Sequence, residues 1–198
     1  MDYDILKPIN DFTARHHWLE QSVKAFEGAS ELVLVVLIGV LFFAVGRSSG
    51  DWARRAAVTA ILSAGLALLL AKLIGELVNR ARPFVDHKVH LLMAHPADAS
   101  FPSEHTTGAF AIAVAILLYN RAWGVGALTV AILVGVGRVA LGVHYPGDVL
   151  GGALLGTACA VALSIGPLGV RVRQLADWVS ARWVALLGRV LPPSNTAA

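Results

Sequence analysis

Apolar residues gather in five long runs along the chain, and short polar segments separate these runs. The runs lie at about residues 26–46, 56–78, 106–119, 122–141 and 149–170. A helix needs roughly 20 apolar residues to cross the hydrocarbon part of a bilayer, and most of the runs approach that length. The pattern predicts an all-α integral membrane bundle of about five transmembrane helices, whose termini lie on opposite sides of the membrane.

Amphipathic segments flank the predicted bundle at both ends. Residues 9–26 carry apolar side chains at helical spacing with charged residues between them, and residues 172–190 carry an apolar stripe with arginines beside it. Both patterns are typical of helices that lie on a membrane surface. The uncharged part of the first run, residues 32–45, is short for a full span, so we expect Glu27 and Glu31 near one interface.

Composition supports the membrane interpretation. Hydrophobic residues make up 57% of the chain and charged residues 15%, and the mean hydropathy is +0.68. These values exclude an ordinary soluble domain. The net charge is +3 but the basic residues are scattered, so no nucleic-acid partner is expected. The chain shows no internal repeat, and we interpret residues 1–198 as one membrane-embedded domain.

Three short polar segments interrupt the apolar pattern, at residues 79–84 (NRARPF), 100–105 (SFPSEH) and 137–152 (GRVALGVHYPGDVLGG). Counting the predicted spans places all three on one side of the membrane. The other side carries eight of the 16 basic residues, namely Arg47, Arg54, Arg55, Arg121, Arg171, Arg173, Arg182 and Arg189. Because cytoplasmic loops are enriched in arginine and lysine, we expect the three polar segments to face the extracytoplasmic side.

The third polar segment has the residues of a nucleophilic site. His144 and Asp148 are four residues apart, so the carboxylate can hold one imidazole nitrogen and leave the other free to attack. Arg82 and Arg138 offer fork-shaped donors that match phosphate oxygens. This combination indicates phosphoryl transfer in which fixed positive charge takes the place of a metal, so no cofactor is expected.

The second polar segment completes this site. Ser103 precedes an apolar run and is predicted to cap a helix whose N-terminus favours an anion. His105, in the first turn, is placed to protonate a leaving oxygen. The alternative is a metal site formed by His105, His144 and Asp148, although two nearby arginines would repel a cation.

Each polar residue also has a purely structural interpretation. Arg138 can extend its side chain to the membrane surface, His144 can be a satisfied helix-end residue, and Ser103 can be only a cap. Lys72 and Glu76 are four residues apart in the second span, where they can form a buried ion pair. The remaining histidines are expected to be solvated, namely His16, His17, His87, His90 and His95.

The order and spacing of the three segments carry a resemblance to a known family. They resemble the three-part signature of the type 2 phosphatidic acid phosphatase superfamily: Arg82-Pro83, then PSEH at 102–105, then Gly137-Arg138 followed at fixed spacing by His144 and Asp148. The match covers residues 72–148, and the other spans fit the helical bundle of that family. The third motif is very specific, and the ordered set of three identifies the family.

The resemblance implies a role for each matching residue. By it, His144 is the nucleophile that forms a phosphohistidine, Asp148 orients it and His105 is the general acid. The phosphate would be held by Arg82, Arg138 and Ser103. Two positions differ from the usual pattern of the family. Gly75 stands in place of a lysine, for which Lys72 about one turn earlier is the candidate substitute, and Glu104 replaces a glycine.

Residues 80–84 (RARPF) and Glu104 are similar to the bacterial undecaprenyl-diphosphate phosphatase branch, of the bacitracin-resistance type. This similarity implies hydrolysis of undecaprenyl diphosphate to the monophosphate and inorganic phosphate, which recycles the lipid carrier of peptidoglycan synthesis. Arg80, with Lys88, is then expected to bind the second phosphate, and Glu104 to favour the protonated form of His105. We expect a multi-pass protein of the bacterial cytoplasmic membrane that contacts membrane lipids and its polyprenyl substrate, with no protein partner.

Two alternatives differ in substrate or in class. A lipid phosphatase of the same fold that acts on phosphatidylglycerophosphate or phosphatidate would carry the same motifs. Outside the enzymes, the alternative is a lipid-phosphate binder or transporter. Transporters are typically built from matched halves with discontinuous helices, which the apolar runs do not indicate.

Overall fold

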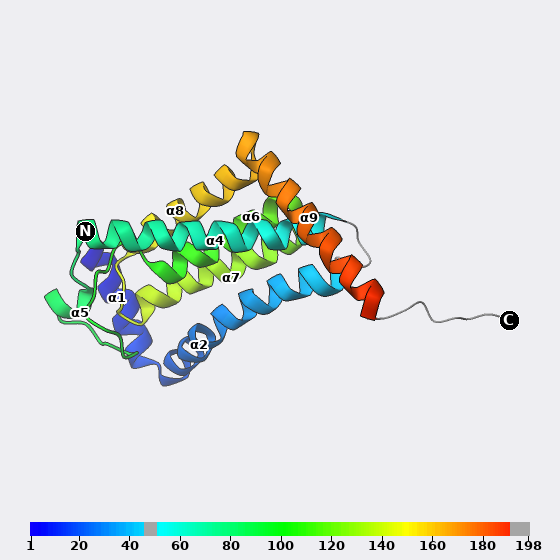
Figure 1. The fold of residues 1–198 in the computed structure, drawn as a ribbon. Coiled ribbons are helices and arrows are strands. Elements are labelled where there is room, and N and C mark those ends of the chain that lie inside the picture. The colour runs from blue at the N-terminus through cyan, green and yellow to red at the C-terminus, as the bar shows by residue number, and fades with distance from the viewer. Residues whose placement is uncertain (46–50, 191–198) are drawn as a thin grey trace.

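The computed structural model describes residues 1–45 and 51–190, which fold into a bundle of helices (Figure 1). The elements are α1 (Asp2–Arg15), α2 (His17–Val40), η1 (Leu41–Val45), α4 (Asp51–Val78), α5 (Pro83–Asp86), α6 (Glu104–Tyr119), α7 (Arg121–Ala140), α8 (Pro146–Ser164) and α9 (Gly166–Val190). Within the described residues, α2, α4, α7 and α8 are long and apolar enough to cross a membrane, and α6 is a shorter apolar helix. The predicted all-α membrane bundle is confirmed.

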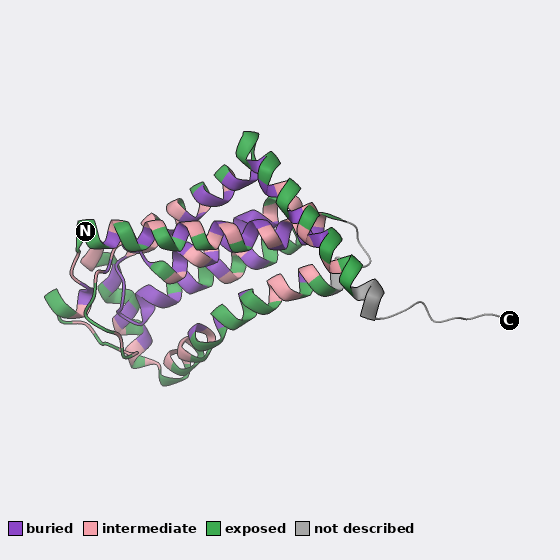
Figure 2. Cartoon of the chain, in the orientation of Figure 1, coloured by how far each residue is buried: buried purple, intermediate pink, exposed green. Residues whose placement is uncertain are grey.

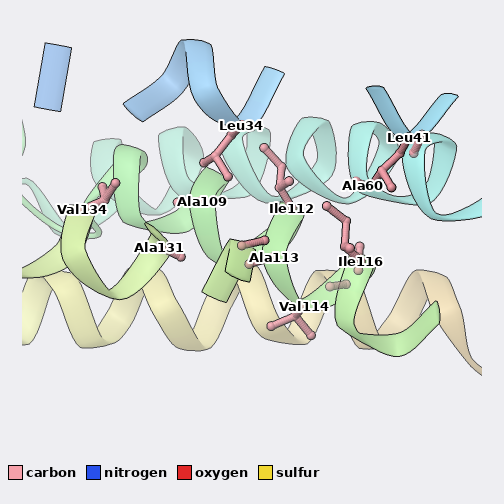
Figure 3. Packing of buried hydrophobic residues seen from close by; sticks show 14 of the residues in the cluster. Leu34, Leu41, Ala60, Ala109, Ile112, Ala113, Val114, Ile116, Ala131 and Val134 are labelled. Atoms are coloured by element: carbon pink, nitrogen blue, oxygen red, sulfur yellow. The ribbon is translucent and has the colours of Figure 1, made fainter. Parts of the chain in front are cut away.

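The short helix α6 is the centre of this bundle. It packs against α4, α7 and α8, and much of it is buried (Figure 2). A helix that is apolar on all sides needs no face toward water, which is compatible with this central position. In Figure 3, Ile112 and Ile116 of α6 lie among side chains of the neighbouring helices, including Leu34, Leu41 and Ala60.

At the N-terminus, the boundary predicted for the first amphipathic helix is wrong. The segment 9–26 is not one helix, because the chain bends at His16, where α1 ends and α2 begins. Helix α1 folds over the end of the bundle and buries Leu6 and Asn10. The Asn10 amide donates to the carbonyls of His90 (2.9 Å) and Ala140 (3.0 Å), so α1 is fastened to the loops beside it. The helical spacing in the sequence continued across a bend that no glycine or proline marks.

At the C-terminus, the fifth predicted span ends earlier than expected. Helix α8 stops at Ser164, and Gly166 has a φ of +63° before α9 begins. A glycine in the left-handed region followed by a proline is a common way to end a helix. The apolar residues 165–170 therefore belong to α9, whose later part is the basic amphipathic segment predicted over 172–190.

Helix α8 approaches α6 very closely because two of its residues lack side chains. A Cβ at Gly156 would lie 2.3 Å from the Thr107 carbonyl oxygen, and one at Gly152 would lie 2.7 Å from that of Ser103. Small residues allow helix backbones in membranes to come together in this way. The contact brings the start of α8 against the start of α6, where the polar segments meet.

Candidate active site

The three polar segments come together at the end of the bundle that α1 and α5 cover (Figure 1). The first lies between α4 and α5, the second leads into α6, and the third joins α7 to α8. Backbone hydrogen bonds connect them: the N–H of Ser100 donates to the carbonyl of Arg80 (2.8 Å), and the N–H of Ser103 donates to that of Asp148 (3.1 Å). Residues far apart in the sequence thereby form one site.

His144 and Asp148 face each other at this point. His144 is 2% exposed, and its Nδ1 lies 3.6 Å from Oδ2 of the fully buried Asp148. The other ring nitrogen, Nε2, lies 3.0 Å from Nη1 of Arg82. Because a guanidinium can only donate, this contact requires a lone pair on Nε2. The proton of a neutral His144 is then on Nδ1, toward Asp148, and Nε2 carries the lone pair of the nucleophile, which accepts from Arg82 in this structure.

The surroundings of His144 favour this neutral form. Burial lowers the pKa of His144 to about 4, and the positive charges of Arg82 and Arg138 act in the same direction. The carboxylate of Asp148 opposes the shift and does not cancel it. A neutral imidazole is the form that acts as a nucleophile, so His144 is ready for attack at neutral pH.

A network of donors holds Asp148 in place. Its Oδ2 accepts hydrogen bonds from the Ser100 hydroxyl (2.5 Å) and the Tyr145 N–H (2.9 Å), and its Oδ1 accepts one from Nη1 of Arg80 (2.8 Å). With both oxygens bound, the carboxylate keeps its charge and its orientation. The sequence did not indicate a role for Ser100, because a serine in a polar loop has no spacing that sets it apart.

Arg82 is held by the loops on either side of it. Its Nη1 donates to the carbonyl of Val143 (3.0 Å), its Nη2 to that of Ala99 (3.3 Å), and its Nε to the carboxylate of Asp98 (2.8 Å). Arg82 therefore fixes the loop that carries His144 while it presents positive charge to the site. Asp98 is a further residue that the sequence did not single out.

Arg138 differs from Arg82 because part of its guanidinium has no partner. Its side chain is 1% exposed, and Nη1 lies 3.5 Å from Oε2 of Glu27 on α2. Within the described residues, Nε and Nη2 of Arg138 are buried and make no hydrogen bond. A buried unsatisfied donor costs about 1–3 kcal/mol, and more when it is charged. Two adjacent unpaired donors on a cation match two oxygens of a bound phosphate.

Ser103 and His105 occupy the start of α6 as predicted. Ser103 is the N-cap, and its hydroxyl oxygen accepts a hydrogen bond from the Thr106 N–H (3.5 Å). His105 lies in the first turn, and its Nε2 is 3.1 Å from Oε1 of Glu31 on α2. The carboxylate that contacts His105 in the described structure is therefore Glu31, not its sequence neighbour Glu104.

The other predicted phosphate ligands lie in two different settings. Arg80 contacts the carboxylates of Asp148 and Asp2, both at 2.8 Å, and stacks over the ring of Tyr145. These are all contacts within the protein, and binding of a second phosphate by Arg80 stays a prediction. Lys72 and Glu104 line a polar cavity of about 550 Å³ that Arg82 also borders, so they lie beside the site rather than at His144.

One histidine prediction is wrong. His95 was expected to be solvated, but its side chain is only 14% exposed and its ring centroid lies 6.2 Å from that of His144. Burial lowers the pKa of His95. His87 and His90 are exposed, as predicted. Among the described residues, no three His, Cys, Asp or Glu side chains gather as a metal site, and the cationic groups at the site are arginines.

Comparison with known proteins identifies relatives of this chain. The chain is 34% identical over 194 residues to undecaprenyl-diphosphatase BcrC of Bacillus subtilis, an alignment that covers 96% of this chain and 95% of that protein. It is 35% identical to decaprenylphosphoryl-5-phosphoribose phosphatase of Mycobacterium tuberculosis, over 72% of this chain and 75% of that one.

Solved structures show the same fold. Aquifex aeolicus LpxE superimposes with a TM-score of 0.66 and 27% identity, over 80% of this chain and 92% of that one. A transmembrane phosphatidylglycerolphosphate phosphatase of Bacillus subtilis gives 0.62, also with 27% identity and with 82% of each chain covered. Residues 56–168, which carry all three polar segments, match the PAP2 superfamily. The family suggested by the motifs is confirmed: the chain is a multi-pass membrane phosphatase of the PAP2 superfamily.

Proposed function

We propose that this protein hydrolyses undecaprenyl diphosphate to undecaprenyl phosphate and inorganic phosphate. The observation that carries the proposal is the similarity to undecaprenyl-diphosphatase BcrC over nearly the whole length of both chains. The site supports it, because a buried nucleophile, a phosphate-binding guanidinium and a candidate acid lie at one end of a membrane bundle. By this proposal the product returns a lipid carrier to peptidoglycan synthesis.

The geometry suggests a course for the reaction. Nε2 of His144 bonds to the terminal phosphorus while the bond from phosphorus to the bridging oxygen breaks. His105 gives its proton to that oxygen, and the free donors of Arg138 bind the phosphate oxygens as charge develops on them. Water, deprotonated by His105, then attacks the phosphohistidine and releases inorganic phosphate.

A lipid substrate also fits the shape of the protein near His105. A groove of about 280 Å³ between α2, α4 and α6 is bordered by His105 and Glu31 at one end and by apolar residues along its length, including Leu68 and Ile112. A polyprenyl chain can lie along such a surface while its diphosphate reaches the polar end. A soluble phosphate ester has no apolar chain to occupy this groove.

The alternative is a related lipid phosphatase with another headgroup. It is favoured by the relative named for decaprenylphosphoryl-5-phosphoribose and by the structural neighbour named for phosphatidylglycerolphosphate. A binder without catalysis is disfavoured because a buried His144 lies beside the carboxylate of Asp148 with its pKa lowered, an arrangement that binding does not need.

Purified protein assayed on undecaprenyl diphosphate, phosphatidylglycerophosphate and phosphatidate tests the proposal. We expect the highest kcat/KM on undecaprenyl diphosphate, and a His144→Ala control should release no phosphate from any of the three. A preference for another lipid of about tenfold, which is about 1.4 kcal/mol in transition-state binding, would assign the alternative substrate. Binding of all three without release would favour a binder.

We further propose that the site faces the extracytoplasmic side of the cytoplasmic membrane. The support is the arginine-rich opposite side, since positive loops remain in the cytoplasm. In a variant without Cys159, a cysteine at position 90 should react with an impermeant reagent added to intact cells, and one at position 122 should not. The reverse labelling pattern would contradict this orientation.

A further inference from the structure

Helix α2 sends two carboxylates into the site, although it contributes no residue to the three polar segments. Glu27 and Glu31 are four residues apart and therefore on one face of the helix. Glu27 contacts Arg138, with 3.5 Å between Oε2 and Nη1, and Glu31 contacts His105, with 3.1 Å between Oε1 and Nε2. Each of these two acids thus faces one cationic or titratable group of the site.

The position of Glu31 is unfavourable unless it has a function. Its side chain is 71% exposed, and it immediately precedes the lipid-facing apolar residues of α2, of which Leu32 and Val33 are also exposed. An ionisable residue at the edge of a transmembrane segment is usually kept there by a specific partner. In the described part of the chain, the partner of Glu31 is His105.

His105 needs a negative neighbour to act as an acid. Arg138 and Arg82 face it from the other elements of the site, and their permanent positive charges oppose an imidazolium. A phosphate group offsets the charge of these arginines only while the substrate is bound. The Glu31 carboxylate is a permanent opposite charge at hydrogen-bond distance, and it favours the protonated ring.

We propose that Glu31 is the positioning residue of the general acid His105, an inference that rests on the phosphatase mechanism proposed above. Its carboxylate accepts the Nε2–H of the imidazolium and holds the ring. Nδ1–H is then the donor that faces the leaving oxygen. When the bond from phosphorus to that oxygen breaks, the Nδ1 proton moves to the oxygen, and His105 becomes neutral while Glu31 remains ionised.

The position of Glu31 also fits a general acid that protonates a lipid leaving group. Glu31 and His105 border the same end of the apolar groove between α2, α4 and α6. A leaving group whose chain lies in this groove has its oxygen beside His105. Glu31 contacts the ring from the side of α2, so it can hold His105 without contacting the substrate's phosphorus.

The test uses soluble aryl phosphates, whose hydrolysis depends on leaving-group protonation to different degrees. p-Nitrophenolate leaves without a proton, whereas phenolate needs one. In Glu31→Gln we expect kcat/KM on phenyl phosphate to fall at least about tenfold and on p-nitrophenyl phosphate less than about threefold, because general acid catalysis typically contributes about 10²–10⁴-fold. Glu31→Asp should restore part of the loss. Glu20→Gln, on the same helix but paired with Lys24, is the matched control and should resemble the wild type.

A double variant separates positioning from structural support. Because Glu31 is proposed to act through His105, the variant with both Glu31→Gln and His105→Ala should be no slower than His105→Ala alone. Equal losses on both aryl phosphates, or additive losses in the double variant, would overturn the proposal. These assays contain no lipid, so they can contradict the role of Glu31 while the lipid panel still supports undecaprenyl diphosphate as substrate. They can equally support the role of Glu31 when the lipid panel assigns another substrate.

Discussion

The two ends of the helical bundle both contain arginines that reach between helices, but they use them differently. At the end far from the site, Arg55 of α4 makes two hydrogen bonds to Asp177 of α9, at 2.6 and 2.8 Å. Arg54 beside it donates to the Ser180 hydroxyl and to the carbonyl of Phe42. At the site end, Arg138 is more deeply buried and yet leaves Nε and Nη2 without a partner.

The difference indicates how a structural arginine can be told from a ligand-binding one. Arg55 gives its donors to the protein, so its effect is to join α4 to α9. Arg138 keeps donors unpaired in a place where each lowers the stability of the fold. Such an arrangement is understandable when a ligand completes it. Arg82 is intermediate, because its guanidinium holds the loops and also faces Nε2 of His144.

Removing the unpaired donors should have the largest effect on activity. Hydrogen bonds to charged groups contribute about 1.5–3 kcal/mol each, so losing two in Arg138→Ala should lower kcat/KM by about 10²–10⁴-fold. Arg138→Lys should recover only a small part, because an ammonium cannot make the paired contact. Thermal unfolding measured beside the assay shows whether the variants are folded. A loss below about threefold in a folded Arg138→Ala protein would contradict phosphate binding by this residue.

The fall in activity at low pH tests whether the pKa of the nucleophile His144 is lowered by its surroundings. At pH 5 an imidazole with the ordinary pKa of about 6.5 would be mostly protonated, and attack would slow about thirty-fold. The pKa of His144 is lowered to about 4, so most of it stays neutral at pH 5 and loses less than about twofold. Measured kcat/KM, corrected for protonation of the substrate, should therefore fall steeply only near pH 4. A fall in kcat/KM centred near pH 6.5 and caused by protonation of His144 would show that its imidazole is exposed.

Local patterns in the sequence were enough to predict the helices and the motifs. Apolar periodicity located α6 and α7 to within two residues and α4 to within five, and the spacing of His144 and Asp148 predicted that the two side chains meet. The bend at His16 was missed because no residue there breaks a helical pattern. Contacts between distant segments were also missed. From the sequence, Glu27 and Glu31 were predicted only to lie near a membrane interface, since the packing of α2 against the bundle is needed to show which residues they face.

Arg80 offers a smaller effect that separates two roles. It contacts Asp148 and Asp2, so we expect Arg80→Ala to loosen Asp148 and to lower kcat/KM by about 10–10²-fold, the value of one charged hydrogen bond. If this is its role, the losses on undecaprenyl diphosphate and on a lipid monophosphate should be equal. A loss several-fold larger on the diphosphate would instead show that Arg80 leaves its carboxylates to bind the second phosphate.

The smallest change should come from the far end of the bundle, where the comparison began. Arg55 and Asp177 are both partly exposed, with side chains 34% and 44% accessible, so water screens their attraction despite the favourable two-point geometry. Exposed ion pairs contribute about 0–1 kcal/mol, and we expect Arg55→Ala to lower the free energy of unfolding by no more than this while kcat/KM changes less than about twofold. Asp177→Ala should match it, and the double variant should be no less stable than either single one, because each removes the same pair. If Arg55→Ala reduced activity as strongly as Arg138→Ala does, satisfied donors would no longer distinguish a structural arginine from one that binds phosphate.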